Sequence, residues 1–282
     1  MELTLDHASL IGQGLSAQVY AWNEGRVLKL YPSSRSRSDV EREFSVTQAV
    51  RAAGFPAPAA YELVELQGRP GIIFERLRGV TMLKQVEARP LTLFAAARQL
   101  GELHAQLHQC PAPLNLPSQR QQLEGWIGAA KNLPEDKRNA ARRLLAQFPE
   151  GNALCHGDFH PENILMTPSG PMVIDWSNGT RGQALADVAF TSLLFQKANL
   201  PAATPRRIHL LFKVSRALLH RSYLTRYLQL RPGTRAEIAG WMPVLEVAIA
   251  RWRLEGVSQL SSEITGSAGK TPPSAADFGP AR

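Results

Sequence analysis

Short alternations of apolar and polar residues, separated by glycine and proline, predict β-strands along the first 80 positions of the chain. Residues 9–22 predict two strands around a glycine turn, and residues 25–32 predict a third strand that Pro32 ends. Residues 59–77 predict a hairpin with its turn at 67–71. This part of the chain therefore predicts a small antiparallel sheet.

One helix is expected between these strands, over residues 38–54. Ser38 is a suitable N-cap, acidic residues fill the first turn, and Gly54 is suited to the position just past the C-terminus. The sheet should therefore carry a single helix.

After Gly79 the apolar residues recur three and four apart, which is the spacing of amphipathic helices. Helices are predicted in the segments 91–109, 118–131, 134–148 (with Pro134 at its first position) and 184–260. Residues 152–176 predict a loop and a small hairpin. From residue 261 the chain is rich in Ser, Gly, Pro and Ala, which predicts a disordered tail.

This change of pattern predicts an α+β fold of two lobes. Residues 1–78 would form the sheet-rich N-terminal lobe, residues 79–260 a larger helical C-terminal lobe, and residues 261–282 the tail. A cleft between two lobes is a common place for a ligand.

The composition is that of an ordinary globular protein, with 44% hydrophobic and 20% charged residues. No apolar run is long enough for a membrane span, and the N-terminus lacks the basic region of a signal peptide. Neither Cys110 nor Cys155 has metal-ligand spacing, and Cys155 is either a reactive thiol or, as we favour, a small buried hydrophobe. We expect a cytoplasmic protein with no membrane partner.

The net charge of +8 raises the question of nucleic-acid binding. The basic residues are mostly arginines spread along predicted helices, and no known nucleic-acid-binding motif accompanies them. We expect a solvated basic surface and no nucleic-acid partner. Strong salt-dependent binding to DNA or RNA would argue otherwise.

The segment "HGDFHPEN" at 156–163 and the segment "VIDWSNG" at 173–179 concentrate the polar chemistry. Asp158 and Asn163 lie five residues apart in an irregular stretch, and Asp175 ends a short apolar strand. A carboxylate and an amide oxygen suit Mg²⁺, which takes further ligands from phosphates. Asp158 is then free to act as a base toward a hydroxyl nucleophile, as in kinase-type phosphoryl transfer.

The N-terminal lobe offers matching parts. Gly12 and Gly14 would let backbone amides approach phosphates, although a plain hairpin turn explains them equally well. Lys29, on an apolar strand, either extends its ammonium group to solvent or pairs with Glu41 or Glu43 of the following helix.

Together these segments resemble the aminoglycoside phosphotransferase and choline kinase family, which shares the protein-kinase-like fold. "HGDFHPENIL" resembles the family's H-G-D-x-x-x-x-N catalytic loop, and "VIDW" resembles its metal-binding I-D-W/F segment. "EREFSVTQAVRAAGFPAP" and "GELHAQLHQ" resemble two of its helices. The resemblance extends from about Gly12 to Ala189.

The resemblance implies roles for individual residues. Asp158 would be the catalytic base, and Asn163 and Asp175 would bind Mg²⁺ that bridges the phosphates of ATP. Lys29 would contact the α- and β-phosphates, positioned by Glu43.

Further residues of the N-terminal lobe would complete the nucleotide site. Gly12 and Gly14 would begin the loop that covers the phosphates. Phe74, Glu75 and Leu77 would form the hinge that binds adenine through its backbone.

Three other residues are expected to shape the catalytic loop. Asp187 would support it from below, and His156 would brace it. His160 would face either the acceptor or solvent.

The resemblance implies an ATP- and Mg²⁺-dependent phosphotransferase that moves the γ-phosphate to a hydroxyl of a small molecule. Trp176 and Ser177 after the metal-binding Asp175, and the lack of an A-P-E segment, argue against a protein kinase. The acceptor stays open among aminoglycosides, amino alcohols and sugar-like compounds, as does the oligomeric state. Residues 191–260 hold eleven Lys and Arg against three Glu, which disfavours a polycationic acceptor.

The alternative is a catalytically silent nucleotide-binding protein with a kinase fold. A silent kinase usually lacks one of the chemical groups named above. The full set of Lys29, Asp158, Asn163 and Asp175 therefore favours the enzyme.

Overall fold

The computed structural model describes residues 9–14, 16–23, 25–197 and 205–250. The predicted tail at 261–282 and the end of the predicted C-terminal lobe lie outside these residues.

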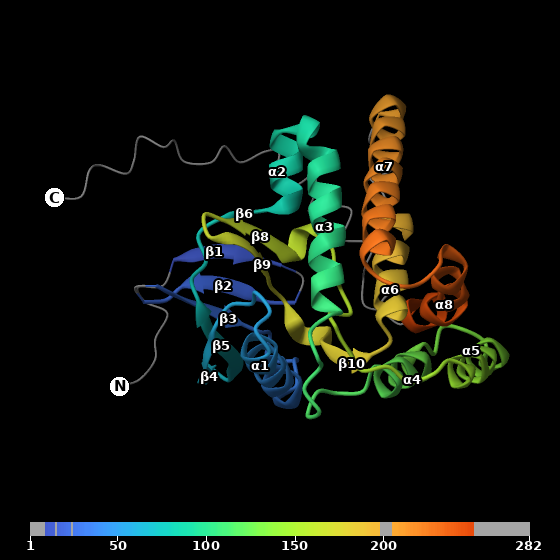
Figure 1. Ribbon diagram of the computed structural model, residues 1–282. Coiled ribbons are helices and arrows are strands. Elements are labelled where there is room, and N and C mark those ends of the chain that lie inside the picture. Colours follow the sequence, from blue (N-terminus) through green and yellow to red (C-terminus); the bar gives the residue numbers. More distant parts are fainter. Residues whose placement is uncertain (1–8, 15, 24, 198–204, 251–282) are drawn as a thin grey trace.

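Five strands between Leu10 and Glu75 build an antiparallel sheet, drawn in blue and cyan in Figure 1. Its five strands stand in the order β1 (Leu10–Gln13), β2 (Gln18–Ala21), β3 (Arg26–Leu30), β5 (Arg69–Glu75) and β4 (Ala60–Leu66). The predicted hairpin is confirmed: Gln67 and Gly68, at φ 53° and 70°, make the two-residue turn between β4 and β5. Positive φ at both positions matches the right-handed twist of the paired strands.

Helix α1 (Arg37–Ala52) is the predicted helix of this lobe, but its N-cap is Ser36 rather than Ser38. The Ser36 hydroxyl accepts a hydrogen bond from the Asp39 amide at 3.2 Å, which places Ser38 inside the first turn. Either serine is a suitable capping residue, so composition alone did not distinguish them.

The C-terminus of α1 follows the prediction. Gly54 has φ +82°, its amide donates to the Arg51 carbonyl, and the Phe55 amide donates to that of Val50. This is the Schellman arrangement, in which glycine takes the left-handed position without steric cost.

Each segment predicted to be helical after Gly79 contains helices where the structure describes it: α3 (Leu93–Leu107), α4 (Gln119–Ala129), α5 (Glu135–Gln147), α6 (Ala184–Lys197), α7 (Arg206–Leu230) and α8 (Arg235–Ala248). The short helix α2 (Met82–Ala88) was not predicted. Pro134 is the N-cap of α5 rather than its first helical residue.

Short strands stand between these helices. β6 (Val80–Thr81) and β9 (Gly170–Val173) flank β8 (Ile164–Thr167), and β7 (Ala153–Cys155) pairs with β10 (Thr180–Gly182). The β8–β9 pair is the small hairpin that the sequence predicted. Three short 3₁₀ turns, Pro90–Thr92, Pro161–Asn163 and Trp176–Asn178, complete the chain described.

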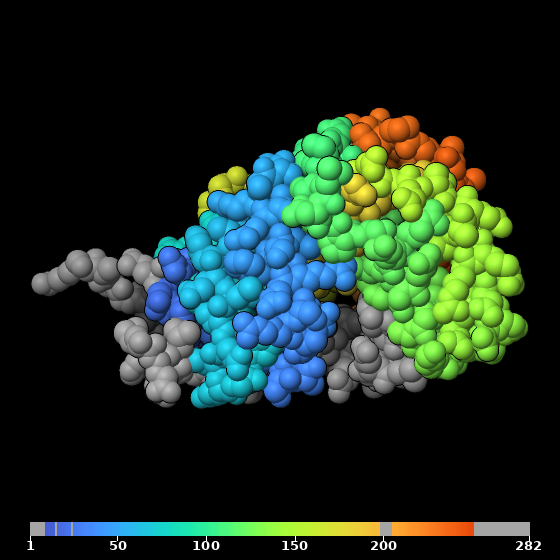
Figure 2. All heavy atoms as spheres, turned by 90° about the horizontal axis from the view of Figure 1, so that it is seen from below, coloured from blue at the N-terminus to red at the C-terminus, as the bar shows by residue number. Residues whose placement is uncertain are grey.

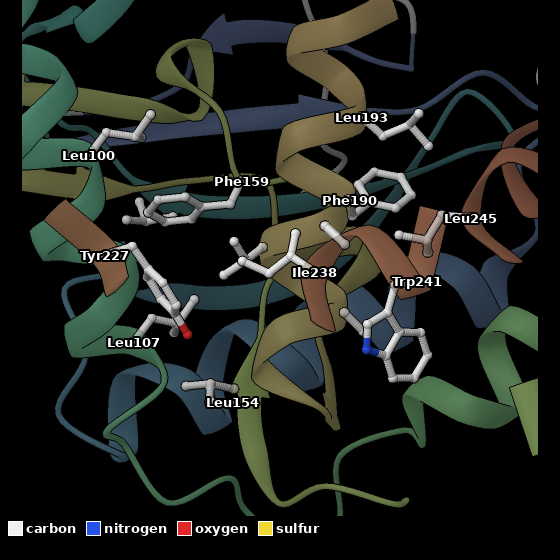
Figure 3. Packing of buried hydrophobic residues seen from close by; sticks show 14 of the residues in the cluster. Leu100, Leu107, Leu154, Phe159, Phe190, Leu193, Tyr227, Ile238, Trp241 and Leu245 are labelled. Carbon is white, nitrogen blue, oxygen red and sulfur yellow. The ribbon is translucent and has the colours of Figure 1, made fainter. Parts of the chain in front are cut away.

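The main core fills the helical lobe and reaches beneath the segment 156–163. In Figure 3, Phe159 of that segment lies in one cluster with Leu100 of α3, Phe190 of α6 and Tyr227 of α7. Gly101 allows α3 to approach α7 closely, because an added Cβ would lie 2.7 Å from the Tyr223 carbonyl oxygen.

Cys155 is fully buried beside this core. Burial raises the pKa of its thiol well above the ordinary value. A buried, protonated thiol is a poor nucleophile, which supports the buried-hydrophobe interpretation.

The two parts of the chain meet at an irregular link, because β5 ends at Glu75 and residues 76–79 form no helix or strand. Figure 2 shows the sheet and α1, in blue and cyan, beside the helices α4 and α5, in green and yellow-green. Among the described helices, none combines the length and the apolar content that a membrane span requires.

Candidate active site

The register of the β8–β9 hairpin brings Asn163 and Asp175 together. Ile164 pairs with Val173 at the end of the hairpin opposite its turn. Asn163 directly precedes β8, and Asp175 follows β9 by two residues, so both lie at this end. The Ile174 amide donates to the Asn163 carbonyl at 2.9 Å and continues the pairing of the two strands. Two side chains that lie twelve residues apart in sequence therefore share one site.

Asp158 completes this group. The Asn163 amide nitrogen Nδ2 donates to the Asp158 carbonyl at 2.9 Å and lies 3.3 Å from its carboxylate Oδ2. Because the N–H groups of Asn163 are turned toward Asp158, its oxygen Oδ1 is the atom left to ligate a cation.

Asp175 has a left-handed backbone with φ 62°, which is uncommon for a residue other than glycine. Its carboxylate lies 3.2 Å from the ammonium of Lys29. Burial alone would raise the pKa of Asp175, but Lys29, the Ser177 hydroxyl and His156 together lower that pKa to about 2. The carboxylate is therefore ionised at neutral pH and available to a metal ion.

The structure also shows which glutamate contacts Lys29. Its Nζ lies 2.7 Å from Oε1 of Glu43, which is only 2% exposed, whereas Glu41 pairs with Arg37 on the surface of α1. Burial alone would lower the pKa of Lys29, but Asp175 and Glu43 hold it well above the ordinary value. Lys29 is thus a fixed cation at the junction of the sheet and the hairpin.

Gly12 and Gly14 lie at the tip of the β1–β2 hairpin. Neither has a positive φ, and an added Cβ would meet its closest neighbour at 3.7 Å or at 4.0 Å. The described fold therefore does not require glycine at either position. A remaining reason for glycine at both positions is that it lets the backbone approach a ligand closely.

The structure places the three predicted hinge residues at the link between the lobes. Phe74 is buried at the end of β5, and Leu77 is half-buried just beyond it. The Glu75 carboxylate accepts hydrogen bonds from the Ala59 amide and from Arg51, at 3.0 and 3.2 Å. The Glu75 amide is engaged as well, because it donates to the Ala59 carbonyl at 2.9 Å.

The loop at residues 156–163 is anchored by Asp187 of α6, the residue expected to support it. Its Oδ2 accepts from the His156 amide at 2.7 Å and its Oδ1 from the Gly157 amide at 2.8 Å. Gly157 has φ +74°, and an added Cβ would lie 2.7 Å from the Asn178 carbonyl oxygen. Glycine is therefore required here by the fold itself.

Sequence analysis missed the groups that hold Asp187 in turn. The Nε2 atoms of His104 and His108, on α3, lie 3.2 and 3.3 Å from its Oδ2. Their Nδ1 atoms lie 2.7 Å from the hydroxyls of Tyr223 and Tyr227 on α7. The only signal in the sequence was that the two histidines, and likewise the two tyrosines, are spaced by four residues.

These contacts account for all four ring nitrogens of the pair. A tautomer with Nε2–H donating to Asp187 and Nδ1 accepting from tyrosine gives every ring nitrogen a partner. The three acceptor groups are close enough to one another to ligate a metal ion, but the hydrogen bonds suffice without one.

Acidification is expected to destabilise the fold through this network. Burial lowers the pKa of His104 to about 4, from an ordinary value near 6.5. Between these two pH values the unfolded chain binds more protons, so stability falls as the pH falls, by up to about 1.4 kcal/mol per pH unit.

Urea unfolding of the wild type between pH 7.5 and 4.5 measures this dependence. His104→Gln should be less stable at neutral pH and should show a shallower slope over the same range. Equal slopes in the two proteins would contradict the assignment.

The two histidines of the loop itself, His156 and His160, have different surroundings. His156 is buried, with Nε2 3.0 Å from the Ile174 carbonyl and Nδ1 accepting from the Asp158 amide at 3.2 Å, so it braces the loop. His160 faces Asp158, with Nε2 3.5 Å from Oδ1. Burial alone would lower the pKa of His160, but Asp158 and Glu162 raise it overall.

The comparisons with known proteins agree with this geometry. Residues 7–228 match the model of the phosphotransferase enzyme family. The chain belongs to this family. The resemblance found in the sequence is thereby confirmed.

Solved structures confirm the fold. A choline/ethanolamine kinase family protein from Mesorhizobium loti superposes with a TM-score of 0.58 at 18% identity, covering 91% of this chain and 80% of that one. A thermostable mutant of aminoglycoside phosphotransferase APH(4)-Ia, in a ternary complex with AMP-PNP and hygromycin B, gives 0.60 at 16% identity, covering 93% and 91%. The expected bilobal α+β fold of the protein-kinase type is therefore correct.

Among curated proteins, the chain is similar to acyl-CoA dehydrogenase family member 10 of Mus musculus, at 26% identity over 207 residues. The match covers 62% of this chain and 18% of that protein. Family member 11 of Gallus gallus is 25% identical, with 55% and 23% covered. The chain thus spans about a fifth of the length of the curated relatives it matches.

Proposed function

We propose that this phosphotransferase moves the γ-phosphoryl group of Mg²⁺-bound ATP to a hydroxyl of a small molecule. The observation that carries the proposal is the position of Lys29, whose ammonium contacts both Glu43 and Asp175. That contact joins the sheet to the end of the β8–β9 hairpin, where Asn163 and Asp158 also lie.

The donor set fits Mg²⁺. The carboxylate of Asp175 and Oδ1 of Asn163 are hard oxygen ligands, and Mg²⁺ commonly takes one or two protein oxygens together with phosphate oxygens and waters. When bound, the ion would neutralise the negative charge that develops on the phosphates. Asp175 is ionised for this role, because its pKa is about 2.

The remaining residues would bind and orient the nucleotide. Lys29, held by Glu43, would contact the α- and β-phosphates, and the amides near Gly12 and Gly14 would cover them. The backbone at Phe74, Glu75 and Leu77 would bind adenine. We place the boundary between the lobes after Arg78, within the irregular link, so the nucleotide would lie in the cleft between them.

Asp158 would accept the proton of the acceptor hydroxyl. The contact with Asn163 fixes its carboxylate within 3.3 Å of the proposed metal ligand. An oriented carboxylate of this kind typically contributes about 10²- to 10⁴-fold to the rate.

The intact set of polar groups supports an active enzyme over a silent nucleotide-binding protein. The relative with hygromycin B and a second one with ADP and streptomycin bind hydroxyl-bearing small molecules. We propose a comparable, still unidentified acceptor here, in the cytoplasm and without nucleic acid or membrane.

A turnover panel tests the proposal. Mg²⁺–ATP would be combined with aminoglycosides, choline, ethanolamine, amino sugars, sugar alcohols and homoserine, and ADP release would be followed. An acceptor that stimulates ADP release in the wild type supports the proposal. Nucleotide binding by thermal shift with no stimulation by any acceptor would favour the silent protein.

Glu43→Gln is expected to lower kcat/KM for ATP by roughly 10- to 100-fold, because a charge-assisted contact to Lys29 is lost. The matched control is Glu41→Gln, two residues away on α1, where the carboxylate pairs with Arg37 at the surface. Steady-state kinetics should leave this control unchanged. Equal losses in both variants would show that the effect is general to α1.

A further inference from the structure

Helix α7 has an unusual charge pattern. Its 25 residues include six Lys and Arg and no Asp or Glu. One of these, Arg226, pairs with Glu102 of α3 at 2.7 Å. The others lack an acidic partner on their own helix, so α7 carries positive charge into the lobe where the acceptor is expected.

Two side chains of α7 hold buried polar atoms without a partner. Nη1 of Arg216 and Nε2 of His220 are inaccessible to solvent and have no hydrogen bond within the described part of the chain. Arg216 has no ion pair with a described residue either; its guanidinium lies 5.6 Å from the Phe212 ring. A buried donor without a partner lowers stability, and more so when the donor is charged.

Both side chains are on the face of α7 that carries Tyr223. A helix repeats every 3.6 residues, so Arg216, His220 and Tyr223 lie on successive turns of one face. The His220 ring lies 5.6 Å from the Phe195 ring of α6, and Tyr223 lies 6.0 Å from the same ring. In Figure 1, α7 runs beside α3, and α6 overlaps its lower part in the view.

That face leads to the catalytic loop. The Tyr223 hydroxyl is 2.7 Å from Nδ1 of His104, and the His104 ring stacks on Phe159 at 4.1 Å. Phe159 follows Asp158 directly in the chain. Arg216 and His220 are thus one to two helical turns along α7 from the support of the proposed base.

We propose that Arg216 and His220 bind an anionic group, a carboxylate or a phosphate, on the hydroxyl-bearing acceptor. A guanidinium binds such a group through parallel hydrogen bonds, and the imidazole N–H adds a third donor. This inference rests on the proposed function, since it names the class of acceptor for that same site.

The surroundings favour an anion over a cation. Burial lowers the pKa of His220, and the nearby positive charges of Arg235 and Arg216 lower it further. An acceptor bearing ammonium groups would meet repulsion here.

The test compares acceptors that differ only in one end group. ω-Hydroxycarboxylates of two to six carbons, hydroxyalkyl phosphates, and the diols and amino alcohols of the same lengths would be assayed with Mg²⁺–ATP for ADP release. Calorimetry with AMP-PNP would measure binding separately from turnover. One of the two anionic series should be used at least tenfold better than the diols and amino alcohols, and which series it is identifies the anion.

Arg216→Gln should raise KM for the preferred anion by roughly 10- to 100-fold with kcat nearly unchanged. Arg216→Lys should recover part of the loss, and His220→Gln should give a smaller increase. The matched control is Arg221→Gln, which removes a charge from the exposed side of α7 and should change neither constant. Thermal unfolding of each variant shows that it is folded.

The outcomes separate the two proposals. Turnover of diols or amino alcohols as efficient as that of the acids, or an unchanged KM in Arg216→Gln, overturns the anion site while the phosphotransferase stands. Binding of an anion that depends on Arg216, with no turnover of any compound, supports the site and contradicts the proposed function. Absence of anion binding overturns the site in every case.

Discussion

Replacing Asp175 with Asn is expected to reduce Mg²⁺–ATP-dependent turnover by roughly 10³-fold or more. The substitution removes the one ionised carboxylate of the proposed metal site and keeps its size. Lys29, which contacts the carboxylates of Asp175 and Glu43, would keep only the contact with Glu43. Both changes weaken the contacts that would hold the phosphates.

Asn is a better choice than Ala because of the backbone. Asp175 has φ 62°, and the left-handed region is costly for most side chains but tolerated by Asn. Asp175→Ala would add this strain to the loss of charge, whereas Asp175→Asn tests the charge alone. The fold should be retained, since the carboxylate is 29% exposed and not part of the core.

Two measurements check this result. ADP release gives the turnover, and a Mg²⁺ titration of AMP-PNP binding gives the metal dependence without any acceptor. The control is Asp39→Asn, which removes an exposed carboxylate from the first turn of α1. Turnover and metal dependence equal to those of the wild type would exclude Asp175 as a metal ligand.

The candidate site was predictable because most of it is local in sequence. Asp158, Asn163 and Asp175 come from one loop and one hairpin, and the hairpin register alone places the last two side by side. Lys29 reaches this site only because the sheet packs against the hairpin, which the sequence does not show. The strand that carries Lys29 and the helix that follows it were nevertheless predictable from the sequence. The remaining choice, Glu43 rather than Glu41, depends on which face of α1 is buried.

The contacts between distant helices were not predictable. The pairing of His104 with Tyr223 joins residues 119 positions apart, and it arises from the packing of α3 on α7 around Gly101. Histidines at helical spacing usually indicate a surface or a core position, with no information about their partner. The partnerless atoms of Arg216 and His220 are a property of packing as well.

Replacing Asp158 with Asn separates catalysis from nucleotide binding. Among the described residues, the Asp158 carboxylate contacts Asn163 and His160 rather than Lys29 or the β1–β2 hairpin. We therefore expect the affinity for AMP-PNP to change by less than about threefold, while turnover falls by roughly 10²- to 10⁴-fold. An Asn side chain of the same shape retains the loop but cannot take up a proton.

Glu162→Gln is the matched control, because it removes a half-exposed carboxylate from the same loop. Single-turnover kinetics at saturating nucleotide would isolate the transfer step in all three proteins. Loss of nucleotide binding in Asp158→Asn would assign the residue to the metal site instead. An equal loss of turnover in Glu162→Gln would show that loop charge, rather than a base at Asp158, controls the rate.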